Sequence, residues 1–563
     1  MPLQPVLAAL LALLLVLAAP LRAEQPALTP IRNPDLAFGL NGVADWSVQQ
    51  PFLDVMKTAR PWVGHLPGQW GGWEHDDLAA GGWLDENGWL RGMPPELTGV
   101  STMILTDLPA DAGAVAGRYR LTHSGKGDLQ VLGRATAVRR TSGGLSFDFT
   151  PGEGGVILMI ARTDPADPVR NISVVREDRV AALAAGELFN PDWLARLRGA
   201  RLLRFMDWMA TNDSTLAHFE DRPKPEDFTW ARNGVPMEVM IALANELQAD
   251  PWFTLPHPAD DALARGYAEM VRDGLAPGLT AHVEFSNEIW NRQFAQARWA
   301  EEQGQARWGR PDTWVEFAAL RAAEVMDIWA QAFAGQPDRL VRVIGVQTGW
   351  LGLEDLILNG PDLAAEGIDL SGRFDAYAVA GYFGGNLASE AKMPLVKAWL
   401  AESRAAAESA AGAGSGRDAY IARHRLDLAV ARAAQELRDG SLSGNPEDSL
   451  NRLLGEVLPH HAAAARARGL DLVMYEGGSH VVGQGMLVGD AELTDFLIHL
   501  NYSPEMGSLY RDLLAGWAGL ADAPFNAFVD VSHPSQWGSW GALRHLTDDN
   551  PRWQALATGC PGC

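Results

Sequence analysis

Residues 281–291 read AHVEFSNEIWN, an apolar, strand-like segment that runs directly into Ser286, Asn287 and Glu288. A buried strand normally closes with turn residues, so an acid at this point has either a structural or a chemical reason. Short apolar or β-branched runs of the same kind recur along the chain. We interpret eight of them as strands, at 38–41, 202–208, 252–256, 282–287, 341–347, 374–382, 470–476 and 525–531.

The segments between these strands carry helical patterns. In residues 314–333, for example, apolar side chains recur at near-helical spacing. Eight strands that alternate with helices in a chain of 563 residues favour an α/β fold, a (β/α)8 TIM barrel, over an open doubly wound sheet. No GxGxxG turn follows the first strand, as a dinucleotide-binding sheet would require.

Two intervals depart from this alternation. Residues 99–176 change to short alternating strands separated by glycine, which predicts a small inserted all-β, sandwich-like domain between barrel strands one and two. It is either a sugar-contacting module or a spacer beside the cleft. Residues 387–461 are helical and alanine-rich, and we interpret them as a solvated excursion rather than a site. The barrel then comprises residues 24–98 and 177–556, followed by a tail at 557–563.

The N-terminus has the pattern of a secretory signal. The apolar run Val6–Ala19 is followed by Pro20, Leu21, Arg22 and Ala23, which gives a small-residue exit and a signal peptide at 1–23. The run is too short to span a bilayer comfortably, and no later segment is long and apolar enough to do so. We therefore expect a secreted or periplasmic protein with no membrane insertion after signal cleavage.

Composition and motifs exclude several functions. A net charge of −24 argues against nucleic acid and against anionic membrane surfaces. The chain has no HExxH, GxSxG or Walker loop, and the adjacent His460 and His461 face different ways on the expected helix. We predict no metal and no cofactor. The two cysteines, Cys560 and Cys563, form either a small terminal disulfide or a redox pair.

Acids stand at two of the expected strand ends. Glu288 ends the fourth strand, and Glu476, in DLVMYEGGSH, ends the seventh. In a barrel the carboxyl ends of all strands meet at one face, so both carboxylates point into the same mouth. Two acids across a cleft are what glycosidic bond cleavage requires. The 21 tryptophans add flat faces suited to sugar rings, although most of them serve the core.

The pairing of SNE at strand four with YEGG at strand seven resembles clan A of the glycoside hydrolases, which are retaining (β/α)8 enzymes. Within that clan the chain is most similar to secreted bacterial proteins labelled cellulose-binding. The resemblance implies an oligo- or polysaccharide substrate, with Glu288 as acid/base, Glu476 as nucleophile and Asn287 as donor to the sugar 2-hydroxyl.

The resemblance also implies supporting roles. Tyr382 matches a tyrosine that hydrogen-bonds the nucleophile, and Arg204 an arginine that keeps it ionised; alternatively, Arg204 pairs with an acid inside the barrel. His257 matches a subsite histidine, or else it is a turn residue. Glu284, on the same strand face as Glu288, we interpret as the structural partner of a cation.

Aromatic side chains complete the expected cleft. Trp537 and Trp540 compete for the platform after strand eight, with Trp540 preferred, and Asp45 and Trp46 after strand one are expected outer contacts. A carbohydrate-binding protein without turnover remains the alternative function, because a shared fold does not guarantee a shared activity.

Overall fold

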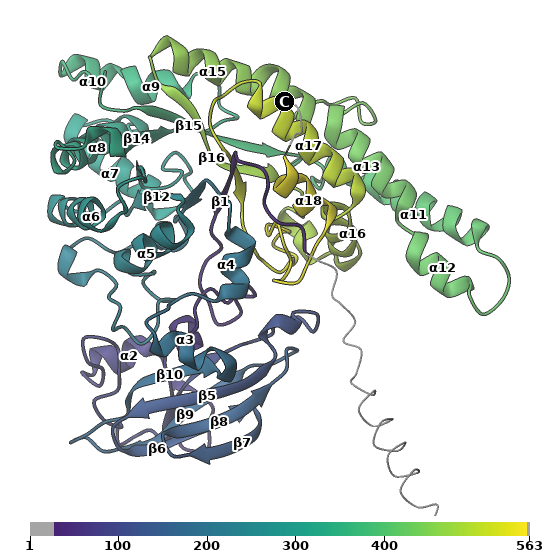
Figure 1. Ribbon diagram of the computed structural model, residues 1–563. Helices are drawn as coiled ribbons and strands as arrows, with labels where there is room; N and C mark the ends of the chain where they lie inside the picture. The colour runs from purple at the N-terminus through teal and green to yellow at the C-terminus, as the bar shows by residue number, and fades with distance from the viewer. Residues whose placement is uncertain (1–27, 560–563) are drawn as a thin grey trace, which may run out of the picture.

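The computed structural model describes residues 28–559. Eight parallel strands close into a barrel in the order β1-β11-β12-β13-β14-β15-β16-β17 (Figure 1). Each strand overlaps a predicted one, so the α/β barrel is confirmed. The bounds are β1 Leu36–Gly39, β11 Leu202–Arg204, β12 Asp250–Leu255, β13 Ala281–Phe285, β14 Leu340–Gly345, β15 Ala376–Phe383, β16 Asp471–Ser479 and β17 Phe525–Phe528.

Helices surround the barrel (Figure 1). In α6 (Asp261–Gly274) the Asp260 side chain caps the first turn by accepting from Leu263 N, and the buried residues recur at helical spacing. The other helices around the barrel are α4 Pro191–Leu197, α5 Met237–Leu247, α7 Ala295–Trp308, α8 Trp314–Ala332, α9 Leu353–Asn359, α10 Pro361–Ala365, α15 Leu458–Ala467, α16 Ala491–Asn501, α17 Pro504–Ala518 and α18 Pro551–Thr558.

The predicted β-insertion lies between β1 and β11 as two antiparallel sheets, with orders β10-β5-β8-β7 and β3-β2-β4-β9-β6. Strands β2 and β3 precede residue 99 and join the second sheet because β2 pairs with β4. The antiparallel structure therefore begins before the predicted boundary. The strands are β2 Val63–His65, β3 Gly72–Trp73, β4 Gly99–Ile104, β5 Gly117–Ser124, β6 Gly127–Gly133, β7 Thr136–Thr141, β8 Gly144–Phe149, β9 Val156–Thr163 and β10 Arg170–Arg176, and short helices α2 His75–Ala80 and α3 Val180–Ala184 accompany them.

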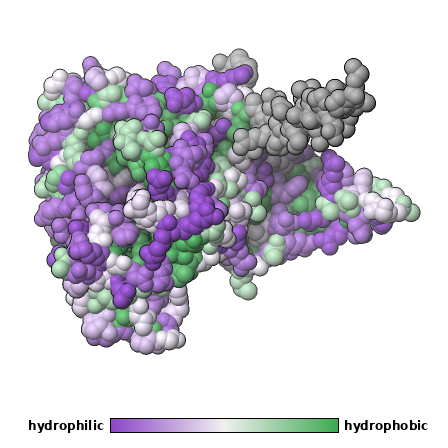
Figure 2. Space-filling model, turned by 60° about the horizontal axis from the view of Figure 1, so that its bottom comes forward, coloured by the Kyte–Doolittle hydropathy of each residue, from purple (hydrophilic) through white to green (hydrophobic). Residues whose placement is uncertain are grey.

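A second insertion connects β15 to β16 through α11 Met393–Ala410, α12 Arg417–His424, α13 Asp427–Asp439 and α14 Leu450–Arg452. Figure 1 shows α11 and α12 projecting from the barrel as an arm. The arm also projects in Figure 2, on a face that is mostly hydrophilic. At the base of the arm, the buried Lys392 Nζ lies 2.6 Å from Glu436 Oε1 and joins the loop before α11 to α13.

The predicted signal peptide, Cys560 and Cys563 lie outside the described residues. Within residues 28–559, no helix has the length and apolarity needed to cross a membrane.

Candidate active site

The segment that follows β13 is a tight turn rather than a continued strand. β13 ends at Phe285, and Ser286 and Glu288 have φ angles of +61° and +39°. Left-handed backbone is unfavourable for residues other than glycine, and it concentrates at functional sites where the surrounding structure enforces it. Asn291 N donates to Glu288 O at 2.7 Å and closes the turn. The turn presents the Glu288 carboxylate at the carboxyl end of the barrel.

One buried arginine organises the floor of the site. Arg204, at the end of β11 and 1% exposed, donates through Nη1 to Glu476 Oε1 at 2.8 Å and through Nη2 to Glu284 Oε2 at 2.8 Å. Its guanidinium lies over the rings of Trp252 and Tyr475, at 5.5 and 5.2 Å from their centroids. The interpretation of Arg204 as the partner of an acid inside the barrel therefore holds, and the prediction that Glu284 pairs with a cation is confirmed.

Glu476 is held by two donors. Besides Arg204, the Tyr382 hydroxyl donates to Glu476 Oε2 at 2.9 Å, so both carboxylate oxygens have partners. Burial raises the pKa of Glu476 to about 8; the Arg204 charge opposes this shift, the Glu288 charge adds to it, and the Tyr382 hydrogen bond again opposes it. The predicted effect of Arg204, to favour the ionised form, is present but smaller than the effect of burial.

Glu288 has a different environment. Tyr475 Oη donates to Glu288 Oε1 at 3.1 Å, and Asn291 Nδ2 donates to Oε2 at 3.2 Å. The residue is partly buried and borders a cavity of about 380 Å³ together with Tyr382 and Tyr475. Glu288 and Glu476 thus lie at one mouth of the barrel. Tyr382 links them, because it lines the cavity and its hydroxyl donates to the Glu476 carboxylate.

The helical insertion forms a wall of this cavity. Residues after β14 and β15 line one side, and the segment that leads into and through α14 lines the other. The interpretation of residues 387–461 as only a solvated excursion is therefore wrong for this segment. The insertion contributes Glu447, Asp448, Ser449, Arg452, Leu453 and Val457 to the lining.

The amide of Asn287 is engaged within the protein. Its Oδ1 accepts from Arg204 Nη2 at 2.8 Å, and its Nδ2 donates to Asn212 Oδ1 at 3.1 Å.

His257 is 5% exposed, packs edge-on against Trp299 at 5.5 Å, and has a pKa lowered to about 4 by burial. Among the described residues, no hydrogen bond joins His257 to Glu288 or Glu476.

The predicted aromatic contacts differ in position and in exposure to solvent. The Trp540 ring lies 6.2 Å from Tyr382 and 5.2 Å from His480, beside the Glu476 cluster, whereas Trp537 is 67% exposed. Trp46 is 61% exposed.

The carboxylate of Asp45 is buried and accepts from Arg60 at 2.7 Å. Asp45 therefore lies in an ion pair between the β1 loop and the β-insertion, instead of at the open edge of the mouth.

Tyr475 is the residue that sequence reasoning missed. Alternation along a strand predicts that Tyr475 and Glu476 point to opposite faces. The β15–β16 register shifts here, with Val379 opposite Met474 and Ala380 opposite Glu476, so that Tyr475 is an extra residue in the ladder. This irregularity brings the Tyr475 hydroxyl to Glu288. The local sequence could not have predicted it, because the extra residue is defined only by how β16 pairs with β15.

A His-rich cluster lies outside the mouth. Glu354, His460 and His461 bring possible ligand atoms within 4.8 Å of one another. Both ring nitrogens of His461 already have hydrogen-bond partners, Tyr377 Oη at 2.8 Å and Thr348 O at 2.9 Å. His460 Nε2 lies 2.6 Å from Glu354 Oε1. These bonds describe a structural link between α9, α15 and β15.

Comparison with known proteins gives distant similarities only. No model of a known protein family matches the chain, and no curated protein matches it. Among solved structures, the chain is similar to a Bacteroidetes-affiliated GH5 cellulase (11% identity, 65% of this chain and 84% of that one, TM-score 0.32). It is also similar to the endo-1,4-β-D-mannanase of Thermotoga petrophila (13%, 65% and 92%, TM-score 0.29).

A third similar structure is Bacteroides uniformis β-glucuronidase 2 (9% identity, 78% of this chain and 44% of that one, TM-score 0.28). All three are glycoside hydrolases. At TM-scores this low, the similarities carry no weight for function, and none of these proteins supports the cellulose-binding label.

Proposed function

We propose that this protein is a retaining glycoside hydrolase that cleaves β-glycosidic bonds of an oligo- or polysaccharide. The observation that carries the proposal is a pair of carboxyl groups at one barrel mouth in unlike environments. Glu476 is buried under two donors, and Glu288 borders the open cavity. Unlike environments around two carboxyl groups are how one fold assigns the roles of acid and nucleophile.

In the proposed first step, Glu476 attacks the anomeric carbon while Glu288 protonates the leaving oxygen. Arg204 and Tyr382 hold the attacking carboxylate in position, and the Tyr475 hydroxyl orients Glu288. In the second step Glu288 takes a proton from water, the water oxygen bonds to the anomeric carbon, and the bond to Glu476 breaks. Trp540, beside Tyr382, is positioned to stack on the sugar held over Glu476.

A second candidate is a carbohydrate-binding protein without turnover. The observation that favours it is the pKa of Glu476, because a carboxyl group raised to about 8 is largely protonated at neutral pH and a protonated carboxyl group is a poor nucleophile. The cavity would still bind sugars.

In both cases we propose that the protein acts outside the cytoplasm, because residues 1–23 have the pattern of a secretory signal. Fractionation of cells that express the full chain tests this location.

The two functions are separated by incubating the protein with β-glucans, xylans, mannans and galactans between pH 6 and 9 and measuring new reducing ends. We expect release from at least one substrate by the wild type, and none above background by Glu476→Gln. The amide is nearly isosteric but cannot form the glycosyl ester. Binding without new ends across the panel would contradict the proposed enzyme, and full activity in Glu476→Gln would contradict the assignment of Glu476 as the nucleophile.

A further inference from the structure

The cavity beside Glu288 is lined by that residue, whereas Glu476 is not one of its lining residues. Its lining comes from the loops after β13, β14 and β15 and from the helical insertion, together with Tyr475. In the proposed mechanism, the sugar that reacts lies over Glu476, and the leaving group lies on the side of the acid, Glu288. The cavity therefore occupies the position of the leaving group. Its volume of about 380 Å³ lies within the range of small-molecule sites.

Polar atoms in this cavity are arranged for hydroxyl groups. The Oε1 atom of Gln347 is buried and has no hydrogen-bond partner among the described residues, although Gln347 lines the cavity. A buried acceptor without a partner is costly, and a ligand donor would satisfy it. Asp448 is fixed, since its Oδ2 accepts from Asn386 N at 2.9 Å and its backbone oxygen accepts from Gly384 N at 2.8 Å.

The charge balance of the lining selects against anions. Glu288, Glu447 and Asp448 supply three carboxyl groups. Arg452 is the single basic residue of the lining, and it pairs with Glu447 and, at 3.4 Å, with Glu456. A uronate carboxylate in this cavity would meet like charges without an unshared cation, which is unfavourable at short range.

We propose that this cavity is a binding site for the leaving-group sugar, and that it takes a neutral sugar residue whose adjacent hydroxyl groups donate to Asp448 and Gln347. The proposal rests on the proposed glycosidase function. It makes the helical insertion a determinant of specificity, and it assigns the enzyme to bonds between two sugar residues rather than to simple glycosides.

The same site would then also bind a sugar that acts as the acceptor in the second step, in place of water. When the glycosyl ester on Glu476 has formed, a hydroxyl oxygen of a bound acceptor sugar attacks the anomeric carbon. Its proton passes to Glu288, and the ester bond breaks to return the Glu476 carboxylate. Transfer to an added acceptor therefore reports on the cavity, whereas hydrolysis of an aryl glycoside does not need it.

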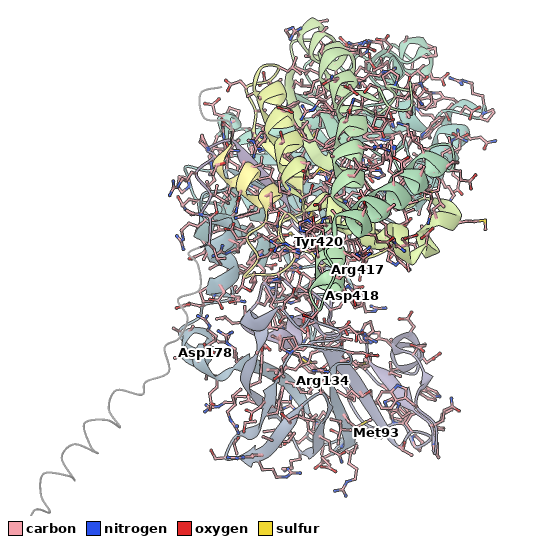
Figure 3. All side chains as sticks on the ribbon, turned by 90° about the vertical axis from the view of Figure 1, so that its right-hand side faces the viewer. Met93, Arg134, Asp178, Arg417, Asp418 and Tyr420 are labelled. Carbon is pink, nitrogen blue, oxygen red and sulfur yellow. The ribbon has the colours of Figure 1, made fainter. Side chains whose placement is uncertain are left out.

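The test compares Asp448→Asn with Asp418→Asn in the otherwise intact protein. Asn tolerates the φ of +65° at position 448 and retains an acceptor for Asn386 N, so the loop is preserved. Asp418 is exposed on α12, in the same insertion but on the projecting arm (Figure 3). Each variant is given an aryl β-glycoside with increasing cellobiose, mannobiose, xylobiose or glucuronate, and transfer products are measured beside hydrolysis.

We expect Asp448→Asn to lower the ratio of transfer to hydrolysis for the preferred disaccharide by about tenfold or more. Asp418→Asn should match wild type, and glucuronate should be a poor acceptor for all three proteins. Gln347→Met, which removes the orphan acceptor at similar volume, should reproduce the loss if Asp448→Asn does not fold.

Equal losses in transfer and hydrolysis, no loss of transfer, or efficient transfer to glucuronate would each overturn the assignment of this site. Wild-type protein that hydrolyses no glycoside would instead contradict the proposed enzyme. In that case, calorimetric titration with the same disaccharides decides the site, with weaker binding expected in Asp448→Asn and unchanged affinity counting against it.

Discussion

Arg204 is the residue on which the electrostatics of the site depend. It is one cation between two buried carboxyl groups, those of Glu284 and Glu476, and no other guanidinium or ammonium group contacts either of them among the described residues. The cluster therefore cannot be neutral with both acids ionised, and burial favours a proton on one of them. Asp207, whose own pKa burial raises to about 6, adds further negative potential at Glu476.

This imbalance predicts an alkaline pH profile. Attack requires the deprotonated carboxylate, so kcat/KM for an activated aryl β-glycoside should rise with pH, with a midpoint near the Glu476 pKa of about 8. Tyr382→Phe removes a hydrogen bond that lowers this pKa, and should move the midpoint upward and reduce the rate about tenfold.

The matched control is Tyr119→Phe, because Tyr119 Oη donates to Val115 O within the β-insertion. Its pH profile should coincide with that of wild type. A wild-type midpoint near 4 to 5, typical of an unperturbed glutamate, would show that the buried cluster does not govern the nucleophile.

The roles of Glu288 and Glu476 can be separated by chemical rescue. In Glu288→Ala, an activated aryl glycoside should still form the glycosyl ester, which then accumulates because water lacks its base. Azide needs no deprotonation and should yield a β-glycosyl azide. In Glu476→Ala, azide would fill the vacated nucleophile side and give the inverted α product. The anomeric configuration of the glycosyl azide, determined by NMR, distinguishes the two roles. An α azide from Glu288→Ala would reverse the two assignments.

At the scale of elements, the sequence predicts the barrel well and the site only in part. Strands buried on both faces form apolar runs, so each barrel strand could be recognised from composition alone. The partners of Arg204 and the extra residue at Tyr475 depend on which strands become neighbours, and no local pattern carries that information. The wall built around Asp448 was missed for the same reason, since a polar loop far along the chain has no periodicity to mark it.

The irregularity in β16 gives a prediction of its own. Tyr475→Phe removes the donor to Glu288 Oε1 but keeps the ring that packs against the Arg204 guanidinium. We expect about a tenfold loss of kcat for glycosides with poor leaving groups, because these need a well-oriented acid, and a smaller loss for activated aryl glycosides. Rates across a series of leaving groups measure the difference, and a uniform loss would indicate that Tyr475 acts on packing alone.

At the scale of the whole molecule, both insertions start from the carboxyl ends of barrel strands, β1 and β15. A barrel keeps its core when loops at this end lengthen, so added segments can reshape the mouth without disturbing the fold. Here the helical insertion supplies part of the cavity lining, so we expect the proposed choice of substrate to depend on the internal stability of the insertion.

The buried Lys392–Glu436 pair tests that dependence. Glu436 also accepts from Leu442 N and Ser443 N, so it organises the turn that leads towards Asp448. Lys392→Met leaves a buried carboxylate without its cation, and should lower the free energy of unfolding in urea by about 3–5 kcal/mol. Arg404→Met breaks an exposed pair with Glu492 and should cost only about 0–1 kcal/mol.

Because the turn leads into the segment that lines the cavity, Lys392→Met should also lose cleavage of oligosaccharides more than hydrolysis of aryl glycosides, while Arg404→Met keeps both. Urea denaturation followed by tryptophan fluorescence gives the first measurement, and parallel assays on the two substrate types give the second. A destabilised Lys392→Met that retains the wild-type ratio of the two activities would mean that the insertion contributes to folding and not to the choice of substrate.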